Sequence, residues 1–300
     1  MEYQRYENKY LKDAVNLLNT CFKNRKITEK SFLWRHFYDF LKHSSASMVA
    51  IGNGKVNSFV CFTPLTVTDK NKKEHNFYSC SVQATRKEFR RQGLVTKLTQ
   101  LVEKKLGEST NYMGFSNSSG VKIDKFSQKI SYRIIGQMTT QYVVSYPYKI
   151  NLQLNKISTL PKVKISYPPY FGLKKDSGFL NWRYSEHPKI KFEFLEITKN
   201  SLPIGHLVYK KGRKINEVSN ILLKNYNPKM YREIVRAFAN FSFKQNQLLT
   251  SYSFLKNKFW DKCFPKLSFR QKNEFHFTLK TKNLAMQDAE NWLIQGGDIL

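Results

Sequence analysis

The loop Arg90-Arg91-Gln92-Gly93-Leu94-Val95 combines the residue types that bind phosphate groups. An apolar run ends at Thr85 and a helical pattern begins directly after Gly93, so several backbone N–H groups should meet there without helical partners. Such groups bind anions together with the positive end of the helix dipole, and glycine lets a phosphate approach the backbone closely. Arg90 and Arg91 would add positive charge. The loop therefore predicts a pyrophosphate site; a basic surface loop before an ordinary helix is the alternative.

The segment QATRKEFRRQGLVTKLTQLVEKKL, residues 83–106, resembles the acyl-CoA signature of the GCN5-related N-acetyltransferases (GNAT). That signature is commonly written R/Q-x-x-G-x-G/A, and Val95 here replaces its final glycine or alanine while keeping the backbone amide. The resemblance extends over most of residues 5–145. It implies acyl-CoA as the cofactor, with its pyrophosphate at Arg90, Arg91, Gln92, Gly93, Leu94 and Val95, and its pantetheine arm at the backbone of Gln83 and Thr85 and at Asn117.

Acyl transfer from a thioester to an amine requires a neutral amine, a hydrogen-bond donor to the developing oxyanion and a proton for the departing thiolate. By the resemblance, a backbone N–H of the signature strand serves the oxyanion. Ser127 stands where a tyrosine of the family often protonates the thiolate. A serine is a poor acid, so another residue or solvent would have to supply that proton.

Candidates for the base are few near the signature strand, because no Asp or Glu lies between Phe77 and Thr85. His75, just before this stretch, is one candidate; a solvated pair of charged residues at a hairpin end is the alternative. Asp298, which follows Gly296-Gly297, could hold the acceptor ammonium or take its proton. An exposed terminal turn is the alternative for Asp298.

Periodicity predicts the elements that would position these residues. In the first half we expect a helix at 10–22, a hairpin at 47–68, a strand at 76–85, a helix at 93–106, a strand at 111–116, a helix to about residue 130 and a strand at 134–145. After a proline-containing crossing segment, the second half repeats this order from Phe192. The predicted fold class is therefore α/β with mixed sheets.

Two segments with a Trp-Arg pair, SFLWRHFYDF and GFLNWRYSEHP, resemble each other, and each precedes an expected hairpin. The repeat predicts two GNAT-like domains in tandem, an acyl-CoA-binding domain at residues 1–150 and a degenerate copy at 151–300. The second copy has no glycine in KNYNPKMYREIV, so we expect it to form an acceptor site or an interface instead. Trp182, Arg183 and Tyr184 could bind substrate; a structural role shared with the first segment is the alternative.

The formal net charge of +29 is spread evenly over the two halves and would attract phosphate-bearing partners. The four cysteines show no CxxC spacing, which favours small buried residues in a reducing compartment over a metal site. Charges are scattered through the first residues, and no apolar run approaches the length of about 18 residues that spans a bilayer. We therefore expect a cytoplasmic protein that does not bind a membrane.

The leading hypothesis is an N-acyltransferase that moves an acetyl or 3-hydroxybutanoyl group from acyl-CoA to the amine of a dTDP- or UDP-linked amino sugar. The donor follows from the signature. The acceptor is implied only by a resemblance of the tandem layout and of the final motif Trp-x-x-x-x-Gly-Asp to proteins of polysaccharide biosynthesis. Two alternatives remain: a Fem-like transferase that takes aminoacyl groups from tRNA, against which the intact glycine loop argues, and a non-catalytic nucleic-acid-binding protein, for which no known motif is present.

Overall fold

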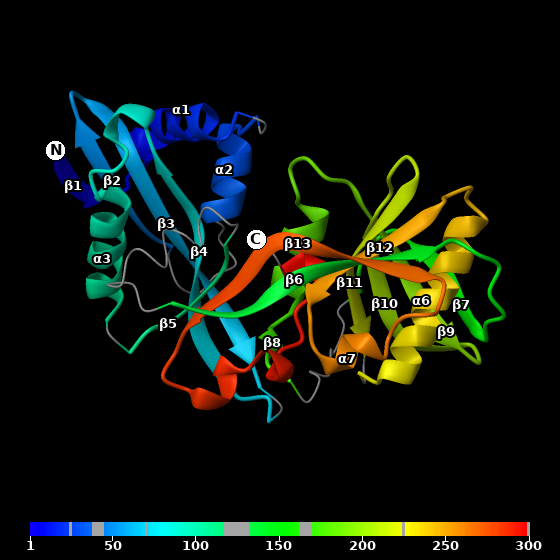
Figure 1. Ribbon diagram of the computed structural model, residues 1–300. Coiled ribbons are helices and arrows are strands. Elements are labelled where there is room, and N and C mark those ends of the chain that lie inside the picture. Colours follow the sequence, from blue (N-terminus) through cyan, green and yellow to red (C-terminus); the bar gives the residue numbers. More distant parts are fainter. Residues whose placement is uncertain are drawn as a thin grey trace. The chain divides into compact units, whose positions relative to one another are not determined.

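The computed structural model describes residues 1–23, 26–37, 45–69, 71–107, 109–116, 132–161, 170–223 and 226–298. The chain forms two units, each containing a β-sheet and helices (Figure 1). Unit 1 comprises Met1–Thr66, Asn76–Ile134 and Thr278–Lys282, and unit 2 comprises Val67–His75, Ile135–Phe277 and Asn283–Leu300. The main division lies between Ile134 and Ile135 and not at residue 150; in addition, residues 67–75 belong to unit 2 and residues 278–282 to unit 1. The domains expected at 1–150 and 151–300 stay a prediction.

Unit 1 is built on a sheet whose strands follow the order β1-β2-β3-β4-β5, with the end of β13 beside β5. Its elements are β1 (Glu2–Arg5), α1 (Leu11–Cys21), α2 (Glu29–His36), β2 (Ala46–Gly52), β3 (Lys55–Thr68), β4 (Glu74–Thr85), α3 (Leu94–Leu106), β5 (Asn111–Ser116) and the last residues of β13 (Ser268–Lys280). Strand β2 pairs antiparallel with β1 and β3, whereas β4 and β5 are parallel. Parallel neighbours require a crossover connection, and α3 provides it.

Helices cover both faces of this sheet. Side chains alternate along β3, so Cys61 belongs to the core under α1 and α2, while Val60 and Phe62 belong to the core under α3. Helix α3 buries Leu94, Leu98 and Val102 against that second core. Each such side chain contributes about 1.5–3 kcal/mol on burial, which fixes the start of α3 relative to β4.

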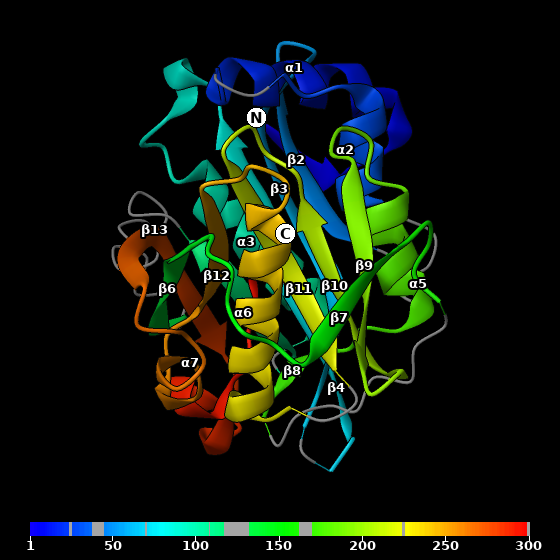
Figure 2. The ribbon, with the colours of Figure 1, turned by 90° about the vertical axis from the view of Figure 1, so that its right-hand side faces the viewer.

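Unit 2 repeats the arrangement of a mixed sheet with crossing helices. Its elements are β6 (Arg133–Val144), β7 (Leu152–Ile157), β8 (Gly172–Leu173), α5 (Ser177–Leu180) with the π-helical turn Asn181–Ser185, β9 (Phe192–Lys199), β10 (Leu202–Lys210), β11 (Ile215–Leu223), α6 (Pro228–Phe243), β12 (Leu249–Leu255), α7 (Lys258–Asp261), most of β13 and the 3₁₀ turn Gly296–Asp298. The strand order is β13-β6-β12-β11-β10-β9-β7, and α6 packs on this sheet with contacts to β12 and β7 (Figure 2).

The order of elements in the two units is the same. In each, a short helix with a Trp-Arg pair is followed by an antiparallel hairpin, a strand, a crossover helix and a strand parallel to the previous one. The predicted α/β class with mixed sheets is confirmed, and the helices and strands predicted for the first half agree with the described elements to within two residues, whereas in the second half α7 is shorter than expected and β13 begins six residues earlier than the strand expected at 274–280. The helix expected before residue 130 lies outside the described residues. Strand β1 was not predicted, because EYQR has little apolar pattern and gains its conformation by pairing with β2.

The four cysteines of this fold are not paired with one another. Cys61 and Cys263 are buried, Cys21 and Cys80 are half-buried, and none of them forms a disulfide. Within the described ranges, no cluster of three potential metal ligands is found. Likewise, none of the helices in these ranges is both long and apolar enough to cross a bilayer.

Candidate functional site

Strands β4 and β5 separate partway along the sheet of unit 1. Residues 77–79 of β4 pair with residues 111–113 of β5, and no pairing is recorded beyond them in the described residues. Strand β4 nevertheless continues to Thr85. Its second half therefore presents a backbone edge to which an extended ligand could add like a further strand.

Strand β4 also changes phase where this edge begins. Tyr78 and Cys80 pack in the core under α3, whereas Val82 and Ala84 pack in the core under α1 and α2. Strict alternation would place all four side chains on one face, so one extra residue is accommodated between Cys80 and Val82, as in a β-bulge. A bulge leaves backbone groups without ladder partners, which makes this point suitable for contacts to a bound ligand.

The loop between β4 and α3 has an unusual backbone. Arg91 and Gly93 both have left-handed conformations, with φ of 65° and 71°. Gly93 is the N-cap of α3 and has no side chain to accept a hydrogen bond from the first turn. The first backbone hydrogen bond recorded for the helix start is from the Lys97 amide to the Gly93 carbonyl, at 2.9 Å. Among the described residues, the amides of residues 91–96 therefore have no partner outside the helix, which is the backbone arrangement that favours an anion.

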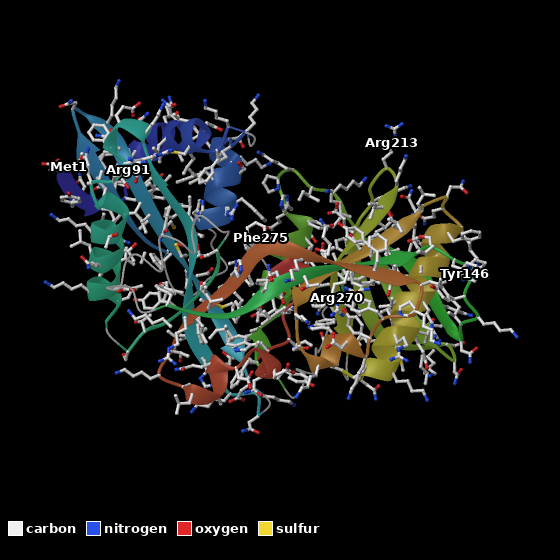
Figure 3. The ribbon with its side chains drawn as sticks, in the orientation of Figure 1. Met1, Arg91, Tyr146, Arg213, Arg270 and Phe275 are labelled. Atoms are coloured by element: carbon white, nitrogen blue, oxygen red, sulfur yellow. The ribbon has the colours of Figure 1, made fainter. Side chains whose placement is uncertain are left out.

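Space and charge at this loop fit a pyrophosphate. A Cβ at Gly93 would have no atom within 4 Å, so the surface beside it is open. Arg91 is exposed at the start of α3, with no recorded partner in the described part of the chain (Figure 3). Arg90 is also exposed, and its Nε donates to the Thr85 carbonyl at 3.1 Å. One arginine is thus fixed against the strand end while the other is available to an anion.

A third arginine fastens the loop to the rest of unit 1. Arg86 donates from Nε to the Val56 carbonyl at 2.9 Å and from a terminal nitrogen to Asp13 at 3.0 Å. Asp13 lies on α1 and Val56 on β3, so two elements hold the loop in place. The predicted residues Gln83, Thr85 and 90–95 are therefore brought together by β4 and α3. Asn117 and Ser127 lie outside the described residues.

A buried histidine that the sequence did not single out lies behind β4. The Nδ1 of His36 is 2.9 Å from the Ser81 hydroxyl, which accepts from Thr63 at 3.0 Å and donates to the Cys61 carbonyl at 3.1 Å. Burial, with the nearby Arg35 charge, lowers the pKa of His36 well below its usual value, so the ring is neutral at pH 7. The Ser81 hydroxyl has all its hydrogen-bonding positions filled, with His36 as a donor. This cluster ties α2 to the sheet and leaves no free hydrogen-bonding position on the Ser81 hydroxyl for a substrate.

His75, the candidate base, is the second residue of β4 and belongs to unit 2 together with the turn that precedes it. Its Nε2 is 3.2 Å from Asp69, and the same carboxylate accepts from the amides of Asn71 and Lys73. Burial raises the pKa of Asp69, but the hydrogen bonds from His75 and from the two amides outweigh it and hold that pKa below its usual value. His75 is only partly exposed, so it is not the freely solvated residue of the alternative interpretation.

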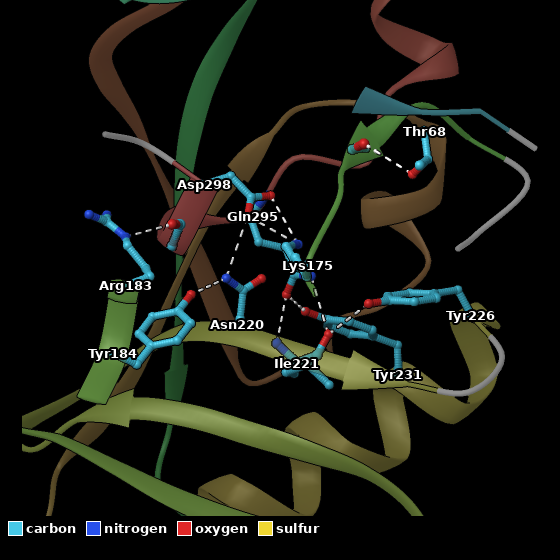
Figure 4. Close-up of polar contacts among 12 residues, drawn as sticks. Thr68, Lys175, Arg183, Tyr184, Asn220, Ile221, Tyr226, Tyr231, Gln295 and Asp298 are labelled. Atoms are coloured by element: carbon cyan, nitrogen blue, oxygen red, sulfur yellow. Dashed lines mark hydrogen bonds and ion pairs between the residues drawn. The ribbon is translucent and has the colours of Figure 1, made fainter. Parts of the chain in front are cut away.

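Three of the predicted residues of the second half, Arg183, Tyr184 and Asp298, come together in one polar network (Figure 4). Asp298 is fully buried, and its carboxylate lies 3.0 Å from the ammonium of Lys175, which is also buried. The alternative of an exposed terminal turn is therefore wrong. Arg183 donates to the Gly297 carbonyl at 3.0 Å, and Tyr184 contacts Asn220, which lies 3.5 Å from Asp298.

This network already binds an ammonium group, that of the chain's own Lys175. Trp182 and Tyr184 are each about 2 % exposed, which favours the structural role for this segment. Burial raises the pKa of Tyr184 far above its usual value, so it stays a neutral phenol. The partnership of Asp298 with Lys175 could not be predicted, because no local pattern links residues 123 positions apart. The only sequence signal was the Gly-Gly-Asp run, which is typical of a close backbone approach.

Neither a family model nor a curated protein sequence matches this chain. Solved structures of the same fold do match it. A probable N-acyltransferase from Enterococcus faecalis V583 has a TM-score of 0.70 and 11% identity, with 93% of this chain and 72% of that chain covered. For a GCN5-related N-acetyltransferase from Anabaena variabilis ATCC 29413 the TM-score is 0.67 and the identity 11%, over 95% and 73% of the chains.

A third match is the GCN5-related glucosamine N-acetyltransferase region of a fungal multi-domain β-N-acetylglucosaminidase. It has a TM-score of 0.56 and 12% identity, with 92% of this chain and 38% of that chain covered. At these identities the comparisons establish the fold. The chain therefore has the GNAT fold, as the signature loop implied.

Proposed function

We propose that the chain is an acyl-CoA-dependent N-acyltransferase whose cofactor binds to unit 1. The observation that carries this proposal is the left-handed pair Arg91 and Gly93 at the start of α3, which leaves a run of backbone amides open beside an unpaired strand edge. In a GNAT fold, the combination of a glycine loop and a separating strand pair is the arrangement that a pyrophosphate with an extended arm requires.

Each part of the site has a distinct task in this proposal. Acyl-CoA supplies the activated thioester. The amides of residues 91–96 and the Arg91 guanidinium hold the pyrophosphate, and Arg86 keeps the loop fixed through Asp13. The second half of β4 orients the extended arm through backbone hydrogen bonds, and the phase change before Val82 provides an N–H for the developing oxyanion.

No described residue is proposed as the base for the acceptor amine. The Asp298 carboxylate is fully buried and held by Lys175, and His75 lies seven residues before Val82 on β4, about 20 Å along the strand. His75 is oriented by Asp69 in unit 2, and its role as a base stays a prediction from the sequence. Ser127, which stands at the position of the family's usual acid, lies outside the described residues, and another residue or solvent is expected to supply the proton for the departing thiolate.

The proposed acceptor is the amine of a nucleotide-linked amino sugar, and the proposed acyl group is acetyl or 3-hydroxybutanoyl. A net charge of +29 favours a substrate that carries a diphosphate. An amino sugar is also the acceptor named for the fungal region of the same fold. The final Trp-x-x-x-x-Gly-Asp motif supports this acceptor through its resemblance alone.

A panel of acyl-CoA thioesters and dTDP- or UDP-linked amino sugars tests this proposal, with release of free thiol as the readout. We expect Gly93→Trp to lower turnover of acyl-CoA by at least about 100-fold, because an indole would occupy the pyrophosphate position, at a cost near 3 kcal/mol. Gly107→Trp is the matched control, since Gly107 also has positive φ and open surroundings but lies at the opposite end of α3. Equal activity of the two variants would contradict the cofactor site, and activity only with aminoacyl-tRNA would support the Fem-like alternative.

A further inference from the structure

Unit 2 contains a second separating pair of parallel strands. Residues 215–218 of β11 pair with residues 249–252 of β12, and the recorded pairing then stops. Both strands continue, β11 to Leu223 alongside β10 and β12 to Leu255 alongside β6. The gap between them is the counterpart in unit 2 of the gap between β4 and β5.

The C-terminal segment at residues 294–298 fills this gap. On the β12 side, the Leu255 amide donates to the Ile294 carbonyl at 3.2 Å, and Gln295 forms an antiparallel bridge with Phe254. At the point of separation, a Cβ built on Gly296 would lie 3.2 Å from the Ser253 side chain and 3.8 Å from the Val218 carbonyl. The segment thus contacts both strands of the pair.

The side-chain amide of Gln295 acts on β11 as a strand backbone would. Its oxygen accepts from the Ile221 amide at 2.8 Å, and its nitrogen donates to the Ile221 carbonyl at 3.2 Å (Figure 4). The Tyr231 hydroxyl donates to the same oxygen at 3.0 Å and fixes the amide's orientation. Ile221 is the sixth residue after the first paired residue of β11, as Gln83 is in β4. Gln83 is a residue whose backbone is proposed to bind the pantetheine arm.

Two further features lock the segment in place. Gly297 lies so close to the Tyr184 hydroxyl and the Asn220 amide that any Cβ would overlap them. The Asp298 carboxylate forms an ion pair with the buried Lys175. It also accepts a hydrogen bond from the backbone N–H of Gln295 at 3.0 Å. The Gly-Gly-Asp run therefore has a local explanation, in which two residues without side chains pass between the strands and a charged residue anchors the end.

We propose that residues 294–298 occupy in unit 2 the site that the pantetheine arm takes in unit 1, so that each chain binds one acyl-CoA. This inference rests on the proposed function for its unit 1 half. The segment is an internal peptide ligand, and its Gln295 carboxamide replaces an amide of the cofactor. Unit 2 consequently has a GNAT-type sheet that is closed to acyl-CoA.

The stoichiometry of CoA binding to the full chain, measured by calorimetry, tests this inference. We expect one CoA per chain for the wild type and none for Gly93→Trp, because the loop of unit 1 would be the sole site. Two CoA molecules per chain, or one that persists in Gly93→Trp, would overturn the inference. Absence of CoA binding to the wild type would contradict the proposed function instead. In that case, hydrogen exchange over β11 tests whether residues 294–298 fill the gap of unit 2.

Amide hydrogen exchange over β11 reports on the segment without any ligand. We expect Gln295→Ala to speed exchange of the Ile221 amide by at least about tenfold, since that amide loses its acceptor. Gln271→Ala, an exposed glutamine on β13, is the control and should leave β11 unchanged. In the wild type, CoA should slow exchange in residues 91–96 and not in β11. Unchanged exchange in Gln295→Ala, or protection of β11 by CoA, would overturn the inference.

Discussion

The two separating strand pairs of the molecule differ in what they leave open. In unit 1 the edge of β4 ends at a loop with Gly93 at the helix start, whereas in unit 2 the gap between β11 and β12 holds residues 294–298. The same order of elements produces both gaps. The same order of elements thus leaves the edge of β4 open in one unit and brings the chain's own residues into the gap of the other, and under the proposed function the open edge receives the cofactor.

The starts of the two crossover helices show the same contrast. Helix α3 begins at Gly93, which has no side chain and leaves the first amides open. Helix α6 begins after Asn227, whose side-chain oxygen accepts from the amides of Lys229 and Met230 at 2.8 and 3.3 Å. An N-cap of this kind consumes the donors that an anion would need. The start of α6 therefore offers an anion fewer free amides than the start of α3.

The largest expected effect comes from breaking the anchor of the segment in unit 2. Lys175→Met should leave Asp298 as a buried charge without its cation and lower the free energy of unfolding of unit 2 by about 3–5 kcal/mol. Lys174→Met is the matched control, because the neighbouring Lys174 pairs with Glu74 in a partly exposed position and should cost at most about 1 kcal/mol. Denaturation followed by tryptophan fluorescence measures both, since Trp182, Trp260 and Trp292 are buried in unit 2. Similar values for the two variants would show that the anchor is unimportant.

Two glycine substitutions separate stability from cofactor binding. Gly297→Ala should lower the unfolding free energy by about 1–3 kcal/mol through overlap with Tyr184 and Asn220, with CoA affinity unchanged. Gly93→Ala has free space around it and should cost about 1 kcal/mol from its positive φ alone, while CoA affinity falls. Thermal unfolding and calorimetry of the two variants give the four values. A loss of CoA affinity in Gly297→Ala would contradict the separation of the two gaps.

The N-cap of α6 offers a smaller perturbation of the same comparison. Asn227→Ala should destabilise unit 2 by about 1 kcal/mol, because the amides of Lys229 and Met230 lose their acceptor. Asn227→Gly should cost only a few tenths of a kcal/mol and should open the amides as in α3. We expect no additional CoA to bind to Asn227→Gly, since residues 294–298 still fill the gap. A second CoA in this variant would show that capping alone closes unit 2.

The parts of the fold that were predictable from the sequence depend on local patterns. The loop before α3 follows from Gly93 and the adjacent apolar periodicity, and β11 and α6 follow from an apolar run and the Asn-Pro start of the helix. Such signals act over one or two turns of chain and need no knowledge of distant residues.

The rest of the candidate site depends on contacts between distant residues. The Gln295 amide reaches Ile221, 74 positions away, and Asp298 reaches Lys175 over 123 positions. A glutamine that replaces a strand backbone has no pattern of its own, and a lysine within an apolar neighbourhood is normally read as exposed. His36 was missed for the same reason, because its partner Ser81 lies 45 positions later on β4.

The smallest expected effect concerns the turn between β3 and β4, which belongs to unit 2. The pKa of Asp69 is lowered in the folded protein, because the His75 and backbone hydrogen bonds outweigh burial, so its charged form stabilises the fold above its unfolded pKa near 3.9. That contribution is lost as the pH falls through the lower, folded pKa. Asp69→Asn should therefore reduce stability at pH 7 by about 0.5–1 kcal/mol, and the difference from the wild type should shrink below about pH 4. Thermal melts of the variant and the wild type at pH 7 and at decreasing pH measure this difference. His75→Ala should lower the stability less than Asp69→Asn does, because the amides of Asn71 and Lys73 still donate to Asp69. A difference that persists unchanged into acid would show that Asp69 supports the turn through its shape and not through its charge.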